Sequence, residues 1–268
     1  MKEYMYNTSS VLIAVVLFLS MLMAIEIGYR IGRRYVIVAN EAIKSHVSGI
    51  QASMIGLLAL LLGFTFSLSL QRFDERSNAV VEEANAIGTT YLRAQLLPTE
   101  VRQESLQMLR TYVDVRVEAS RVSLVEEAHR QALLDKANKL QAQLWRKALL
   151  AAELAPNPVT TGLYIQTLND MIDSLSKRDA ALHRHVPELV LLLLYVTFLI
   201  AGSIVGFAAG ESNHRPSFAS YLMVVLMVIL VYIILDLDRP RRGLIEVSQA
   251  PLLNLQATIQ QEAKEQKN

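Results

Sequence analysis

The stretch GLLALLLGFTFSLSLQRFDER, residues 56–76, begins as a run of apolar residues and ends as a run of charged ones. Its first part is apolar enough for a membrane-spanning helix, and its last part is typical of a helix in water. Three hydroxyl-bearing residues lie between the two parts: Thr65, Ser67 and Ser69. The stretch is the end of a transmembrane span, or its hydroxyl groups line a path through the membrane.

The composition indicates an integral membrane protein. The chain has 268 residues, 52% of them hydrophobic, and a mean hydropathy of +0.30, which is too apolar for an ordinary soluble domain. The net charge of +1 lacks the basic excess of nucleic-acid-binding proteins, so we expect no nucleic-acid partner. The absence of cysteine excludes disulfides and thiolate metal sites.

Four apolar runs are long enough to cross about 30 Å of hydrocarbon at about 1.5 Å per residue. They are Val11–Tyr29, Ile50–Leu70, Glu188–Ala209 and Phe218–Leu235. The first run continues into Glu26 and Arg30 rather than into a small-residue cleavage site, so we interpret it as an uncleaved span. The sequence therefore predicts an all-α membrane protein with four transmembrane helices.

Residues 71–187 form a hydrophilic insert between the second and third spans. Apolar residues recur in it at helical spacing, as in Val80, Ala84, Ile87 and Tyr91. Pro98 and the turn at residues 156–158 should divide the insert into three long helices. We expect residues 1–70 to form the first transmembrane pair, 71–187 the helical insert, 188–238 the second pair and 239–268 a C-terminal tail.

Basic residues favour a cytoplasmic insert. If the insert and both termini share one side of the membrane, that side carries more arginine and lysine near the spans than the other side does. The first span taken alone gives the opposite orientation, because Arg30, Arg33 and Arg34 follow it closely. The overall count predicts cytoplasmic termini and a cytoplasmic insert.

Small residues form two seams in the predicted spans. The first seam consists of Gly49, Ser53, Gly56, Gly63 and Ser67, and the second of Gly202, Gly206 and Gly210. Small residues at such spacing let helix backbones approach in lipid, where no hydrophobic effect draws helices together. We therefore assign Gly49, Ser53, Gly63, Gly202, Gly206 and Gly210 to helix packing.

The hydroxyl groups of Thr65, Ser67 and Ser69 admit two interpretations. Each can bond back to a carbonyl one turn earlier, which is harmless anywhere in a span. Alternatively, they line a wet passage, and the sequence does not separate these possibilities.

The segment LGFTFSLSLQRF, residues 62–73, resembles the second transmembrane helix of bestrophin-type anion channels. The matching positions are Leu62, Gly63, Phe64, Ser67, Arg72 and Phe73. The order of elements is also similar: two spans, a long helical insert and two more spans. Residues 80–98 and 235–243 look like a widespread bacterial membrane-protein family labelled bestrophin-like.

This resemblance implies a bacterial inner-membrane protein that forms a homo-oligomer, a pentamer in bestrophins, in the lipid bilayer. In bestrophins the second span presents a neck of three apolar residues to a central pore. The matching positions are Gly56, Leu60 and Phe64, of which only Phe64 keeps the aromatic ring. Together with Ser67 they are our pore-lining candidates, and inorganic ions are the implied partners.

Two charged groups follow the second and fourth spans. We interpret Arg72, Asp74, Glu75 and Arg76 as an interfacial ion-pair cluster. Asp236 and Asp238 lie where animal bestrophins place acidic calcium ligands, but Arg239, Arg241 and Arg242 beside them make a poor calcium site. We expect the two aspartates to pair with these arginines or to cap the helix, and we expect no metal and no cofactor.

No enzyme motif stands out in the sequence. His183, His185 and Glu188 do not have the spacing of a metal site on one helix face. A Gly-Lys-Ser/Thr phosphate loop, a Gly-x-Ser-x-Gly elbow and a dinucleotide fingerprint are also absent. We therefore predict no catalytic activity, and two hypotheses remain. The chain is an oligomeric ion channel whose second span lines the pore, or a structural or signalling membrane protein whose insert binds a partner.

Overall fold

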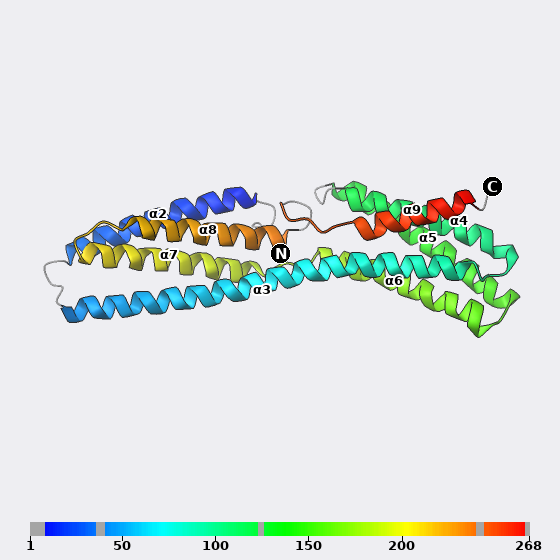
Figure 1. Cartoon of the computed structure of the whole chain (residues 1–268), viewed down its shortest axis with the longest axis horizontal. Coiled ribbons are helices and arrows are strands. Elements are labelled where there is room, and N and C mark those ends of the chain that lie inside the picture. Colours follow the sequence, from blue (N-terminus) through cyan, green and yellow to red (C-terminus); the bar gives the residue numbers. More distant parts are fainter. Residues whose placement is uncertain (1–8, 36–40, 123–125, 240–243, 266–268) are drawn as a thin grey trace. The chain divides into compact units, whose positions relative to one another are not determined.

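The computed structural model describes residues 9–35, 41–122, 126–239 and 244–265 (Figure 1). Within these ranges the regular structure is entirely helical, without strands. Four of the helices are long and apolar enough to cross a membrane, and each contains one of the four predicted spans. The prediction of an all-α membrane protein with four transmembrane helices and a helical insert is therefore confirmed.

One compact unit, here called the membrane unit, contains the apolar helices. It comprises α2 (Ser10–Arg34), the first part of α3 (Glu41–Ala94), α7 (Glu188–Glu211) and α8 (Phe218–Asp238). Helix α2 packs along α7 and also contacts α8 (Figure 1). Buried side chains of all four helices form one core, among them Met21, Leu62, Phe198 and Val231.

Helix α3 continues without a break from the membrane unit into the second unit. It is 54 residues long and contains no proline, so no ring clash or missing N–H interrupts its backbone hydrogen bonds. Its part between residues 50 and 70 is the predicted span, and its part from residue 73 onward belongs to the second unit.

The second unit, here called the insert unit, is a bundle of amphipathic helices. It contains the end of α3, α4 (Thr99–Arg121), α5 (Glu127–Leu154), a short π-helix η1 (Pro158–Gly162), α6 (Leu163–Leu182) and α9 (Ala250–Glu265). Its core includes Ile87, Leu109, Leu144, Leu168 and Leu252, one from each long helix. Helical periodicity in the insert therefore reflects a real apolar core.

The two predicted breaks occur where the prolines lie. Pro98 precedes the first residue of α4, where its missing N–H costs nothing, and Pro158 begins η1. The side chain of Asn157 accepts a hydrogen bond from the N–H of Val159 at 2.8 Å. This contact satisfies one of the N–H groups that a helix start leaves without a partner.

One further break was not predicted. The segment between Pro98 and Pro156 forms two helices, α4 and α5, instead of one. Val122 ends α4 in an extended conformation, and α5 packs back against α4. A single straight helix would leave the apolar faces of both halves in water, so burial decides where the chain turns.

The C-terminal region, predicted as a tail, contains a helix. Helix α9 packs on α4 and buries Leu252 and Ile259. The side-chain amide of Gln256 also donates a hydrogen bond to the Asp114 carboxylate at 2.6 Å. The residues from 250 to 265 thus belong to the core of the insert unit.

Candidate functional site

The four pore-lining candidates lie on one exposed face of α3. Leu60 and Phe64 are 55% and 62% exposed, and Gly56 and Ser67 are also exposed. A Cβ added at Gly56 would meet no atom within 4 Å. Steps of four, four and three residues keep these positions on one side of a helix. The described part of the chain leaves this face uncovered.

The opposite face of the same helix segment is covered. Leu58 and Leu62 are buried in the core of the membrane unit. Thr65 is 2% exposed and donates its hydroxyl hydrogen to the carbonyl oxygen of Leu61 at 2.7 Å. Ser69 is also buried, and its hydroxyl has no hydrogen-bond partner among the described residues. The three hydroxyl groups therefore do not share a face: of them, only Ser67 is exposed.

The small-residue seam of α3 contacts no other helix within the described chain. A Cβ added at Gly49 or at Gly63 would meet nothing within 4 Å. Ser53 is exposed and donates a hydrogen bond to the carbonyl oxygen of Gly49 at 2.9 Å, within its own helix. If this seam packs against a helix, that helix therefore lies outside the described part of this protomer.

The seam of α7 lies against α2. A Cβ added at Gly206 would collide with the carbonyl oxygen of Ile25, and one at Gly210 would collide with that of Tyr29. At Gly202 the same addition would make only ordinary contacts, the nearest at 3.6 Å. The backbones of α2 and α7 therefore approach most closely around Gly206 and Gly210.

Two glycines on α2 complete this crossing. Cβ atoms added at Gly28 and Gly32 would collide with backbone atoms of Ser203 and Phe207 on α7. Gly28 and Gly32 were not predicted from the sequence as packing residues. Their spacing of four, at and just beyond the end of the first predicted span, was the signal that could have identified them.

The four charged residues after the second span separate into different environments. Arg76 is 2% exposed and donates hydrogen bonds to the carbonyl oxygens of Ala181 and Arg184, at 3.2 and 2.7 Å. Glu75 forms a partly exposed ion pair with Arg184 at 3.9 Å. Asp74 is exposed, and Arg72 is half-buried. Arg76 thus binds carbonyl groups at and just beyond the end of α6.

Asp236 and Asp238 accept backbone N–H groups beside the end of α8. One carboxylate oxygen of Asp236 accepts from Leu244 and Ile245, both at 2.9 Å, and its other oxygen is buried without a partner among the described residues. Asp238 accepts from the N–H of Val186 at 3.0 Å. The neighbouring residues Arg241 and Arg242 lie outside the described residues.

A calcium site needs six to eight oxygen ligands. Across the described ranges, no group of three histidine, cysteine, aspartate or glutamate residues is placed to hold a metal ion. His183 contacts the carbonyl oxygen of Asp179 through Nδ1 at 2.8 Å, and His185 contacts that of Asp238 at 3.3 Å. Among the described residues, Asp236 and Asp238 thus accept hydrogen bonds from backbone N–H groups, and whether they pair with Arg241 or Arg242 lies outside these residues.

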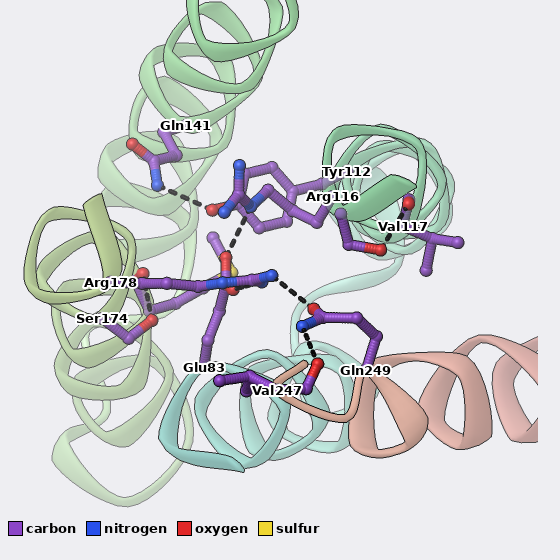
Figure 2. A network of polar contacts seen from close by, with 11 residues as sticks. Glu83, Tyr112, Arg116, Val117, Gln141, Ser174, Arg178, Val247 and Gln249 are labelled. Atoms are coloured by element: carbon purple, nitrogen blue, oxygen red, sulfur yellow. Dashed lines mark hydrogen bonds and ion pairs between the residues drawn. The ribbon is translucent and has the colours of Figure 1, made fainter. Parts of the chain in front are cut away.

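A buried ion-pair network occupies the core of the insert unit (Figure 2). Glu83 of α3 is fully buried, and its carboxylate binds Arg116 of α4 and Arg178 of α6. The Arg116 Nε lies 2.5 Å from the Glu83 Oε1, and an Nη of Arg178 binds the other oxygen. Arg178 also donates to the side-chain oxygen of Gln249 at 2.6 Å. This network joins three helices to the segment that leads into α9.

The network changes the protonation of its members, which lie outside the predicted spans. Burial alone would raise the pKa of Glu83, but the charges and hydrogen bonds of Arg116 and Arg178 outweigh it and hold that pKa below the ordinary value of 4.5. Burial, followed by the negative charge of Glu83, raises the pKa of Tyr112, whose hydroxyl accepts a hydrogen bond from Gln141 at 3.0 Å. Glu83 is therefore a carboxylate and Tyr112 a neutral phenol near pH 7.

This network was not predicted, although the sequence contains a signal for it. Glu83 lies three residues after Val80 and four before Ile87, which places a carboxylate on the apolar face of its helix. A buried carboxylate requires cationic partners, so such a position predicts a buried ion pair. The identity of the partners could not be read from spacing, because Arg116 and Arg178 lie on other helices.

Comparisons with known proteins agree with this architecture. A crystal structure of a variant of a bacterial bestrophin homologue from Klebsiella pneumoniae matches with a TM-score of 0.65 and 18% identity, over 95% of this chain and 97% of that chain. A second variant of that homologue matches with a TM-score of 0.61 and 20% identity, over 92% of this chain and 95% of the other. At these identities the matches show a shared fold. No curated protein matches the chain.

The family assignment rests on a separate comparison. The family model of the Bestrophin-like domain matches residues 27–252, which include part of α2 and the whole of helices α3 to α8. This match covers far more than half of the 268 residues. The chain therefore belongs to the Bestrophin-like family.

Proposed function

We propose that this membrane protein assembles as a homo-oligomeric ion channel of bestrophin-like architecture. In this proposal the exposed face of α3 with Gly56, Leu60, Phe64 and Ser67 lines the permeation path. Anion permeability and a pentameric assembly are parts of the proposal that rest on the resemblance to bestrophins. The proposed location is the bacterial inner membrane, with the insert and both termini in the cytoplasm.

One observation carries the proposal: the predicted pore-lining helix is the span least covered by its own chain. In the most apolar stretch of α3, 22% of the residues are buried, compared with 33% for α2, 39% for α7 and 28% for α8. The exposed side of α3 also has three glycines at which an added Cβ would meet no atom within 4 Å, and the exposed hydroxyl group of Ser67. A face of this kind can pack against other copies of the chain or line a central path.

The chemistry of the face fits a constriction rather than a binding site. Phe64 and Leu60 offer no hydrogen-bond donor or acceptor to an ion. An apolar ring therefore passes ions only when it is wide enough to stay wet. Gly56 widens its own ring, so Phe64 is the proposed point of greatest restriction.

Flux measurement on the reconstituted protein tests this function. The purified chain is placed in lipid vesicles loaded with chloride, and efflux is compared with that of empty vesicles. Chloride efflux above the background supports the channel. Efflux at background across a range of salt concentration, pH and calcium concentration would contradict it.

The alternative is a non-conducting membrane protein whose insert unit binds a partner. It is favoured by exposed apolar side chains of the insert unit: Leu92, Leu96 and Val159 are 58%, 54% and 68% exposed. Exposed apolar side chains of this kind are common at protein interfaces. Chloride efflux of the unchanged chain at the background level, together with loss of a bound protein after Leu92→Ser, would support this alternative.

A further inference from the structure

A partly open cavity of about 220 Å³ lies between α4, α5 and α6 of the insert unit. Its apolar wall consists of Leu134, Leu175, Leu182 and Ala119. Charged and polar side chains make up the rest of its lining. A cavity of this size, smaller than the roughly 300–1,000 Å³ of drug-sized sites, suits a small ligand with an apolar part and a polar part.

The first polar group of the cavity is the guanidinium of Arg116. This residue is 7% exposed, and its Nε is bound to Glu83 (Figure 2). Neither Nη of Arg116 forms a hydrogen bond with any residue in the described ranges. Buried guanidinium donors normally have acceptors. Arg116 therefore presents unused donors to the cavity that it lines.

A second guanidinium lines the cavity from α5. Arg130 is half-buried, and its side chain has no ion-pair or hydrogen-bond partner in the part of the chain that the structure describes. Two guanidinium groups with free Nη donors are the usual partners of a carboxylate, which they can bind through two parallel hydrogen bonds.

Two carboxylates also line this cavity. Glu127 of α5 and Asp179 of α6 line the same cavity, and neither forms a direct ion pair with Arg116 or Arg130. His183 lies beside Asp179, with 3.8 Å between Nδ1 and the carboxylate. Because guanidinium and carboxylate groups both line the cavity, a small ligand that carries one negative and one positive group can find a partner for each of them.

We propose that this cavity binds a free α-amino acid with a short aliphatic side chain. Arg116 and Arg130 hold the carboxylate of the ligand, and Glu127 and Asp179 hold its ammonium group. The side chain of the ligand lies against the wall formed by Leu134, Leu175 and Leu182. This inference concerns the insert unit alone and does not depend on ion conduction.

Calorimetric titration of the full-length chain in detergent with L-leucine tests the proposal. We expect saturable binding that weakens roughly tenfold or more in Arg130→Gln, because hydrogen bonds between charged groups are among the strong ones. Arg130 lies outside the Glu83 network, so this variant keeps the core intact. The control is Arg146→Gln, an arginine on the same helix that does not line the cavity, which should bind L-leucine as the unchanged chain does.

Two ligand analogues test the requirement for both charges. 4-Methylpentanoate lacks the ammonium group of leucine, and 3-methylbutylamine lacks its carboxylate. Both should bind at least tenfold more weakly than L-leucine if each charge has its own partners. No heat of binding with L-leucine, equal affinities of the Arg130→Gln and unchanged chains, or equal binding of 4-methylpentanoate would each overturn the proposal.

Discussion

The carbonyl oxygen of Ile25 on α2 occupies the position that a Cβ on Gly206 of α7 would need. Helix backbones meet there without side chains between them, as small-residue contacts in membranes allow. We predict that Gly206→Ala lowers the free energy of unfolding in detergent by about 2 kcal/mol or more, because the two backbones must separate. A thermal unfolding series measures this change.

Gly49→Ala is the matched control for that substitution. A Cβ at Gly49 meets nothing within 4 Å, and alanine favours a helix over glycine by about 1 kcal/mol. Gly49→Ala should therefore leave the unfolding temperature unchanged or raise it. Equal changes in unfolding temperature in Gly206→Ala and Gly49→Ala would contradict a close α2–α7 crossing.

The second prediction concerns Glu83. Glu83→Gln leaves Arg116 and Arg178 buried without a carboxylate, so we expect a loss of about 3–5 kcal/mol in the free energy of unfolding. Glu82→Gln is the control, because Glu82 is exposed and its ion pair with Lys177 spans 4.0 Å. Such a surface pair contributes at most about 1 kcal/mol. Denaturant unfolding of both variants measures the difference.

The third prediction is a pH dependence of the same network. The pKa of Glu83 in the folded chain lies below its ordinary value of 4.5. Its contribution to stability is therefore complete above about pH 4.5 and is lost as the pH falls through the lowered pKa. The stability difference between the unchanged chain and Glu83→Gln should shrink over this acid range. A difference that stays constant down to the lowest pH at which the chain remains folded would contradict this interpretation.

The fourth prediction concerns the proposed constriction. Phe64→Ala should raise chloride efflux from vesicles several-fold and leave the oligomer size unchanged, because a smaller side chain widens an apolar ring and keeps it wet. The control is Phe66→Ala, which removes an equal ring from a different side of α3. Equal effects of both substitutions, or a loss of stability without any flux, would count against Phe64 as the restriction. Vesicle efflux and size-exclusion chromatography provide the two measurements.

The shared face of the pore-lining candidates could be predicted, because it depends on the geometry of a single helix. The spacing of Gly56, Leu60, Phe64 and Ser67 places them on one face whatever surrounds the helix. The spacing does not show which face of α3 is exposed. The face with Leu62 is covered because other helices pack against it, and this packing cannot be read from one helix.

The amino-acid sequence by itself determined the four spans and the helical insert of this protein. Both follow from local properties: the length of an apolar run and the period at which apolar residues recur. Tertiary structure alone decided that α5 folds back on α4, that Gly206 meets Ile25, and that Glu83 binds arginines 33 and 95 residues later in the chain. Contacts between residues so far apart depend on how whole helices bury their apolar faces together, and no local pattern encodes that arrangement.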